Sequence, residues 1–98
     1  MIVILLLGCM TEPEFQAQYD EAICEWKAEC EPDRVPDAVA CEAEAAAAYT
    51  SPAARCAFDA EAAATCVAGV QELPCTSALD DEESIEFPAA CADVWACP

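Results

Sequence analysis

Nine cysteines are the residues of this chain best suited to chemistry, and eight of them lie in its polar part. These eight are Cys24, Cys30, Cys41, Cys56, Cys66, Cys75, Cys91 and Cys97. The chain has no Cys-x-x-Cys spacing and no histidine, so the spacing favours neither a zinc site nor a thioredoxin-like redox centre. An even number of cysteines in a short chain instead predicts four disulfides, if the chain reaches an oxidising compartment.

The ninth cysteine, Cys9, directly follows an apolar run from Met1 to Leu7. Seven residues are too few for a membrane span, which needs about 20, but they match the short end of a signal-peptide core. Leu6-Leu7-Gly8-Cys9 resembles the lipobox of bacterial lipoproteins. In that family the cysteine receives a diacylglycerol and becomes the first residue after cleavage. The resemblance therefore implies a lipoprotein-type signal peptide over 1–8 and a membrane anchor at Cys9.

Two details of this segment bear on export. No Lys or Arg precedes the apolar run, and a start codon upstream of Met1 would account for that. Met10 stands where an aspartate would favour inner-membrane retention in the enterobacterial type of sorting, so the resemblance favours the outer membrane. If Cys9 carries lipid, the remaining cysteines are even in number, which agrees with four disulfides.

The composition sets the second constraint on this chain. It has 20 acidic and three basic residues, a net charge of −17, which excludes the basic patch that nucleic-acid binding needs. From Cys9 onward only 12 of 90 residues are Leu, Ile, Val or Phe. Because these few large apolar residues can form only a small core, we expect a single domain that depends on its disulfides. We place it at residues 15–98, after a short linker over 9–14.

Helices are the expected scaffold, since the chain is rich in alanine and no window alternates as a half-buried strand would. Thr11 and Glu14 form a capping-box pattern before a helix of about 12–31. Further helices are expected at about 36–49 and 59–73, with a short one starting at Pro88. The fold class is thus all-α, a small bundle of three to four short helices cross-linked by about four disulfides. Chain proximity suggests the pair Cys30–Cys41, and Cys24–Cys66 would join the first and third helices.

Four cysteine-containing segments of the chain carry a second resemblance. Together they look like the small Cys-rich, Ala-rich lipoproteins common in myxobacteria, a family whose activity is largely uncharacterised. The resemblance covers most of residues 9–98 and implies only an envelope location and disulfides. The segments are Tyr19-x4-Cys24-x5-Cys30, Phe58 to Val67, Leu73-Pro74-Cys75 and Ala90 to Trp95.

The remaining polar and aromatic residues point to no enzyme. Without histidine there is no catalytic triad, and no glycine-rich phosphate loop is present, so we expect neither catalytic residues nor a cofactor. Asp80-Asp81-Glu82-Glu83 lacks the spacing of an EF-hand, and we interpret it as a solvated charged segment. The aromatic residues at helical spacing, which are Tyr19, Trp26, Tyr49 and Trp95, are expected in the core rather than on a binding surface.

These observations favour a lipid-anchored, acidic envelope protein that acts as a structural or interaction module. Its partners would be the membrane, through Cys9, and an unidentified protein that is basic. Two alternatives stay open at this point. One is an exported inhibitor or immunity-like protein that binds an enzyme, and the other is a surface protein that binds divalent cations weakly.

Overall fold

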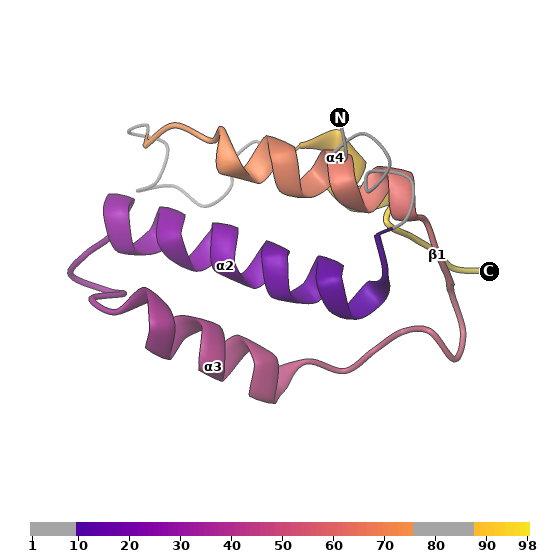
Figure 1. The fold of residues 1–98 in the computed structure, drawn as a ribbon, viewed down its shortest axis with the longest axis horizontal. Coiled ribbons are helices and arrows are strands. Elements are labelled where there is room, and N and C mark those ends of the chain that lie inside the picture. The colour runs from indigo at the N-terminus through magenta and orange to yellow at the C-terminus, as the bar shows by residue number, and fades with distance from the viewer. Residues whose placement is uncertain (1–9, 76–87) are drawn as a thin grey trace.

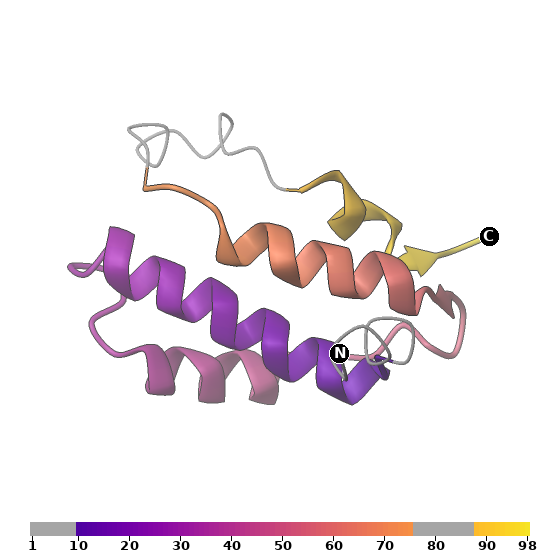
Figure 2. The ribbon, with the colours of Figure 1, turned by 45° about the horizontal axis from the view of Figure 1, so that its top comes forward.

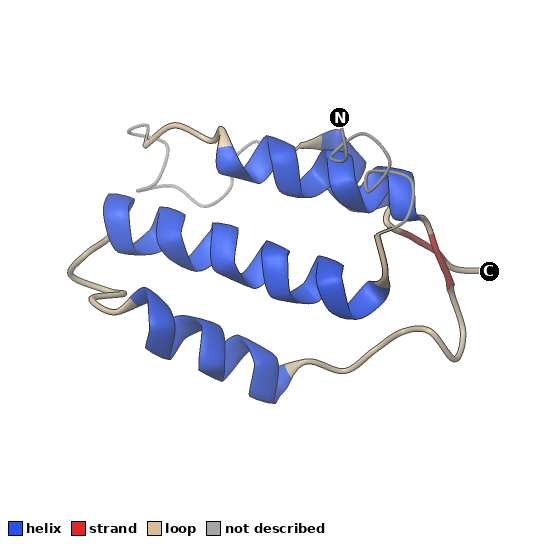
Figure 3. Cartoon of the chain, in the orientation of Figure 1, coloured by secondary structure: helices blue, strands red, loops and turns tan. Residues whose placement is uncertain are grey.

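The protein is described here from a computed structural model, in which residues 10–75 and 88–98 are placed. Three α-helices dominate it: α2 (Glu12–Cys30), α3 (Ala38–Ala48) and α4 (Ala60–Gln71). A 3-10 helix, η3 (Ala89–Asp93), and two short strands, β1 (Ala57–Phe58) and β2 (Trp95–Ala96), complete the described part. Figure 3 shows how small the strand content is. The all-α bundle predicted from the sequence is confirmed.

α2 is the central helix of the three. This helix lies between α3 on one side and α4 on the other, as Figure 1 and the turned view in Figure 2 both show. η3 packs chiefly on α4. The packing order is therefore α3, α2, α4 and η3, and α3 is an outer element that touches the bundle on one side.

Side-chain caps explain where the helices begin. The Thr11 hydroxyl accepts from the Glu14 backbone N–H, and the Glu14 carboxylate accepts from the Thr11 N–H at 2.9 Å. This confirms the capping box. It also shows that α2 begins at Glu12, as predicted, so residues 12–14 of the linker placed over 9–14 are the first turn of this helix.

The other two α-helices begin at aspartates. Asp59 caps α4 through its carboxylate, which accepts from the Ala62 N–H at 2.9 Å. α3 starts after Asp37, whose carboxylate accepts from the Val39 N–H at 3.0 Å, two residues later than the sequence predicted from Pro36. The helix thus begins where the Asp37 carboxylate satisfies a free N–H of the first turn.

The buried core is small and comes mainly from α4 and α2. Val67 and Val70 on α4, Phe15 on α2 and Val94 after η3 are its largest aliphatic and aromatic members. The other buried residues are alanines and cysteines: Ala22, Cys24, Ala63, Ala64 and Cys66. α3 contributes no buried residue at all. Hydrophobic stabilisation scales with the apolar area removed from water, so this core gives limited stability to the bundle.

The two strands form a short antiparallel ribbon that the sequence did not predict. Ala57 pairs with Ala96, and Phe58 pairs with Trp95. The Phe58 ring lies 5.2 Å from the Trp95 ring and 6.0 Å from the Phe15 ring, measured between centroids. The ribbon thereby joins the segment before α4 to the segment after η3 and packs both against the start of α2.

Candidate functional site

All eight predicted cysteines form disulfides, and these bridges are the main chemical feature of the described chain. The pairs are Cys24–Cys41, Cys30–Cys75, Cys56–Cys97 and Cys66–Cys91. Their Cα–Cα distances are 5.7, 5.3, 4.3 and 4.6 Å. Each bridge joins two different elements or segments, so every packed layer of the fold is covalently linked to its neighbour.

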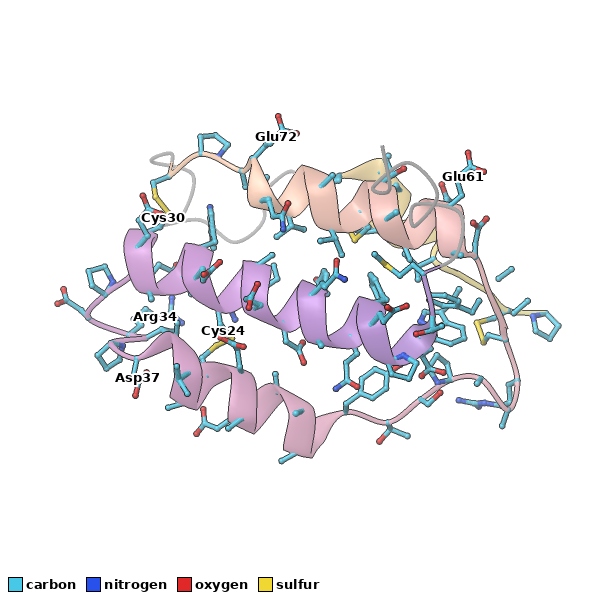
Figure 4. All side chains as sticks on the ribbon, in the orientation of Figure 1. Cys24, Cys30, Arg34, Asp37, Glu61 and Glu72 are labelled. Atoms are coloured by element: carbon cyan, nitrogen blue, oxygen red, sulfur yellow. A yellow bond between two sulfur atoms is a disulfide. The ribbon has the colours of Figure 1, made fainter. Side chains whose placement is uncertain are left out.

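The two pairings suggested from the sequence are both wrong. Cys30 does not pair with Cys41, and Cys24 does not pair with Cys66. Six residues turn a helix by about 600°, so Cys24 and Cys30 face different neighbours. In Figure 4 Cys24 points to α3, while Cys30 lies at the end of α2 beside the segment that follows α4. Cys66 instead faces η3, where it meets Cys91.

The Cys24–Cys41 bridge has a distinct role, because it holds a helix that buries nothing. α3 has no buried residue, whereas the Cys24 side chain is 1% exposed. α3 is held at its other end by a hydrogen bond in which the Tyr49 hydroxyl donates to the Glu12 carboxylate at 2.6 Å. α3 is thus tied to α2 at both ends, by a covalent bond and by a charge-assisted hydrogen bond.

The Glu12–Tyr49 contact perturbs both groups in the directions that a hydrogen bond predicts. Hydrogen bonding from Ser51 and Tyr49 lowers the pKa of Glu12. Burial, followed by the hydrogen bond to Glu12 and its charge, raises the pKa of Tyr49 to about 12. A hydrogen bond that stabilises a carboxylate and keeps a phenol protonated has this effect on both partners.

A groove of about 310 Å³ lies between α2 and α3, along the stretch between these two ties. Its α2 wall consists of Pro13, Gln16, Ala17 and Asp20, and its α3 wall of Glu42, Ala43 and Ala46. The alanines lack side-chain atoms beyond Cβ, so they do not fill the space between the two helix axes. Burial raises the pKa of Asp20, in opposition to a hydrogen bond with Gln16.

One face of α2 carries an exposed row of carboxylates. Glu14, Glu21, Glu25 and Glu29 recur at steps of seven, four and four residues, which places them on the same side of the helix. Arg34 lies 3.9 Å from Glu31 in the loop after α2. Among the described residues no basic group pairs with any carboxylate of this row. The row, which we call the acidic face, is therefore free to interact with cations in solution.

The other candidate residues divide into two groups. Cys9 and the run Asp80-Asp81-Glu82-Glu83 lie outside the described residues. The aromatic residues Tyr19, Trp26, Tyr49 and Trp95 are half-buried, and Tyr19 and Trp95 pack against the core as predicted. Trp26 donates from its indole nitrogen to the Pro74 carbonyl at 3.4 Å.

Over residues 10–75 and 88–98, no group of three or more metal-ligating side chains comes together. None of the helices placed there has the length and apolar character that crossing a membrane requires. No family model matches the sequence, no curated protein is similar to it, and no solved structure matches its fold.

The groove and the Glu12–Tyr49 hydrogen bond were not predicted from the sequence. Each joins residues at least 22 positions apart along the chain, for example Asp20 and Glu42, and so depends on the α2–α3 packing. The run Ala45-Ala46-Ala47-Ala48 was the available signal, since a helix of alanines packs without filling the space beside it.

Proposed function

We propose that this protein is a non-catalytic interaction module of the bacterial cell envelope, anchored by a lipid on Cys9 and binding basic protein partners. The observation that carries the proposal is the acidic face of α2, whose four carboxylates are exposed and form no ion pair within the described structure. A net charge of −17 adds a long-range attraction for cationic partners and raises their association rates.

The acidic face lies on a helix that two disulfides hold in place. α2 is bridged to α3 by Cys24 and to the segment after α4 by Cys30. A rigid helix presents its side chains without losing backbone entropy on binding, which favours recognition by a fixed surface. Glu61 and Glu72 on the outer side of α4 add negative charge to a second surface, where Figure 4 shows them pointing away from the bundle.

The anchor part of the proposal is supported by Leu6-Leu7-Gly8-Cys9 and by the position of Met10. Met10 packs against the core, and α2 begins two residues later. A lipid on Cys9 would therefore hold the bundle close to the membrane, with the start of α2 nearest to it. Metabolic labelling with a palmitate analogue should mark the wild-type protein and not Cys9→Ser, and equal labelling of both would contradict the anchor.

The partner claim is tested by capture from detergent-solubilised envelope with two matched variants. One replaces Glu21, Glu25 and Glu29 by glutamine, which neutralises most of the acidic face. The control replaces three other exposed carboxylates, those of Glu44, Glu61 and Glu72, by glutamine and so removes the same charge. Both sets of residues are exposed.

We expect the wild type and the control to retain a protein that has a basic surface and is released by salt. The variant of the acidic face should lose it. Equal retention by all three proteins would show that the acidic face is not the interface, and capture of nothing by the wild type would overturn the proposed function.

A further inference from the structure

We infer that the groove between α2 and α3 is the site that receives an arginine side chain of a basic partner protein. The inference deepens the proposed function and rests on it in one respect, that the partner is cationic. It adds a specific place, a specific side chain and a specific set of contacts, none of which the acidic face supplies.

Two ties fix α2 and α3 relative to each other beyond both ends of the groove. The Cys24–Cys41 bridge fixes one end of the α2–α3 pair, and the Tyr49 hydroxyl bonded to Glu12 fixes the other. The groove residues, 13–20 on α2 and 42–46 on α3, all fall between these two ties. Three of the seven lining residues are alanines, whose short side chains leave space between the two helices. A site formed before binding loses less free energy on ordering.

Apolar and charged residues both line the groove. Pro13, Ala17, Ala43 and Ala46 are exposed and supply apolar lining. Asp20 and Glu42, from opposite walls, are half-buried. A long basic side chain lays its methylene stem on apolar surface and keeps its charged end beside polar groups, and the lining of this groove contains both kinds of group.

The two carboxylates of the groove favour arginine as the cationic side chain. Two carboxylates on facing walls suit the planar guanidinium, which has five N–H donors and binds carboxylates by paired hydrogen bonds. At about 310 Å³ the groove is at the lower limit of small-ligand pockets and has room for one long side chain. Burial also raises the pKa of Asp20, and a cation beside this carboxylate would oppose that shift.

The test uses the purified chain with its four disulfides formed and a blocked glycine–arginine–glycine tripeptide as the probe. Binding is followed residue by residue in ¹H–¹⁵N NMR spectra at low ionic strength. The matched ligand is the same tripeptide with citrulline, which has the same shape and no charge. The variants are Asp20→Asn and Ala43→Leu in the groove, with Glu44→Gln and Ala47→Leu as controls on exposed positions of α3 that do not line it.

We expect the arginine peptide to shift the signals of Ala17, Asp20, Glu42 and Ala43, and the citrulline peptide to shift none of them. Asp20→Asn should weaken binding about two- to fivefold, the loss expected for one exposed ion pair, and Ala43→Leu should abolish it. Glu44→Gln and Ala47→Leu should leave the affinity unchanged. Helical circular dichroism of each variant checks that the fold is retained.

Three results would overturn the inference, and they separate it from the proposed function. If the arginine peptide shifts only Glu21, Glu25 and Glu29, the groove is not the site while the acidic face still binds cations. If the citrulline peptide binds equally, charge recognition is wrong. If Ala43→Leu binds as well as Ala47→Leu does, the groove is not occupied.

Discussion

Gly69 on α4 offers a sharp test of how the C-terminal segment packs. A Cβ atom added at this position would lie 2.5 Å from Pro88 Cγ and 2.7 Å from Pro88 Cβ. Real Cβ contacts are not that short, and the proline ring cannot turn away, because it is fused to its own backbone. Gly69→Ala therefore requires the segment that leads into η3 to move off α4.

Two opposing effects set the size of the change. Replacing glycine by alanine inside a helix stabilises it by about 1 kcal/mol. Overpacking a close contact costs about 1–3 kcal/mol. We expect Gly69→Ala to lower the free energy of unfolding by up to about 2 kcal/mol. Whether this substitution destabilises or stabilises the protein should depend on the presence of the Pro88 ring.

A double-mutant cycle isolates the contact. Pro88→Gly removes both of the ring atoms that would clash, so in that background Gly69→Ala should stabilise the protein by about 1 kcal/mol. The measurement is guanidinium unfolding of the oxidised proteins, followed by helical circular dichroism. The same stabilisation by Gly69→Ala in both backgrounds would show that Pro88 does not pack on α4 as described.

Three further predictions concern the bridges, the caps and the hydrogen bond of α3. Under limiting reductant, Cys30–Cys75 should open before Cys66–Cys91, since Cys75 is exposed and Cys66 is fully buried; mapping of alkylated thiols by mass spectrometry would show the order, and the reverse order would refute it. Asp59→Ala should cost about 1 kcal/mol of stability in thermal unfolding and Asp59→Asn almost nothing, because asparagine also caps. The Tyr49 phenol, with its pKa of about 12, stabilises the fold below pH 10 and loses that contribution as pH rises towards 12; Glu12→Gln should lower this pKa in an absorbance titration, and an unchanged value would contradict the hydrogen bond.

Local signals in the sequence predicted the helices well. Thr11 and Glu14 form the capping box that starts α2, and Asp59 caps α4, because a cap depends only on residues three positions apart. Phe15 and Val70 each stand four residues from another apolar residue, Tyr19 and Cys66 respectively, and both are buried. Periodicity and capping act within a few turns of helix, so one sequence is enough to find them.

Features that depend on how the helices pack were missed or wrong. Neither suggested cysteine pair forms, since the direction of each side chain around its helix and the choice of neighbour decide the pairing together. The ribbon of Phe58 and Trp95 joins residues 37 positions apart with only two residues in each strand, too few for a strand pattern. The groove exists because alanines on two helices meet across a gap.

The central claim is that four disulfides, rather than a hydrophobic core, hold these helices together. The bridges have sequence separations of 17, 45, 41 and 25 residues. In the chain-entropy model, loops of these sizes are worth about 3–4 kcal/mol each. α3 has no buried residue, and the net charge of −17 opposes a compact state through self-repulsion, which salt screens beyond about 10 Å at 0.1 M.

The most direct test is helical circular dichroism of the chain before and after full reduction, at low and at high salt. We expect the helical signal to fall sharply on reduction at low salt and to fall less at high salt. A reduced protein that keeps its full helical signal at low salt and unfolds cooperatively on heating would contradict the claim.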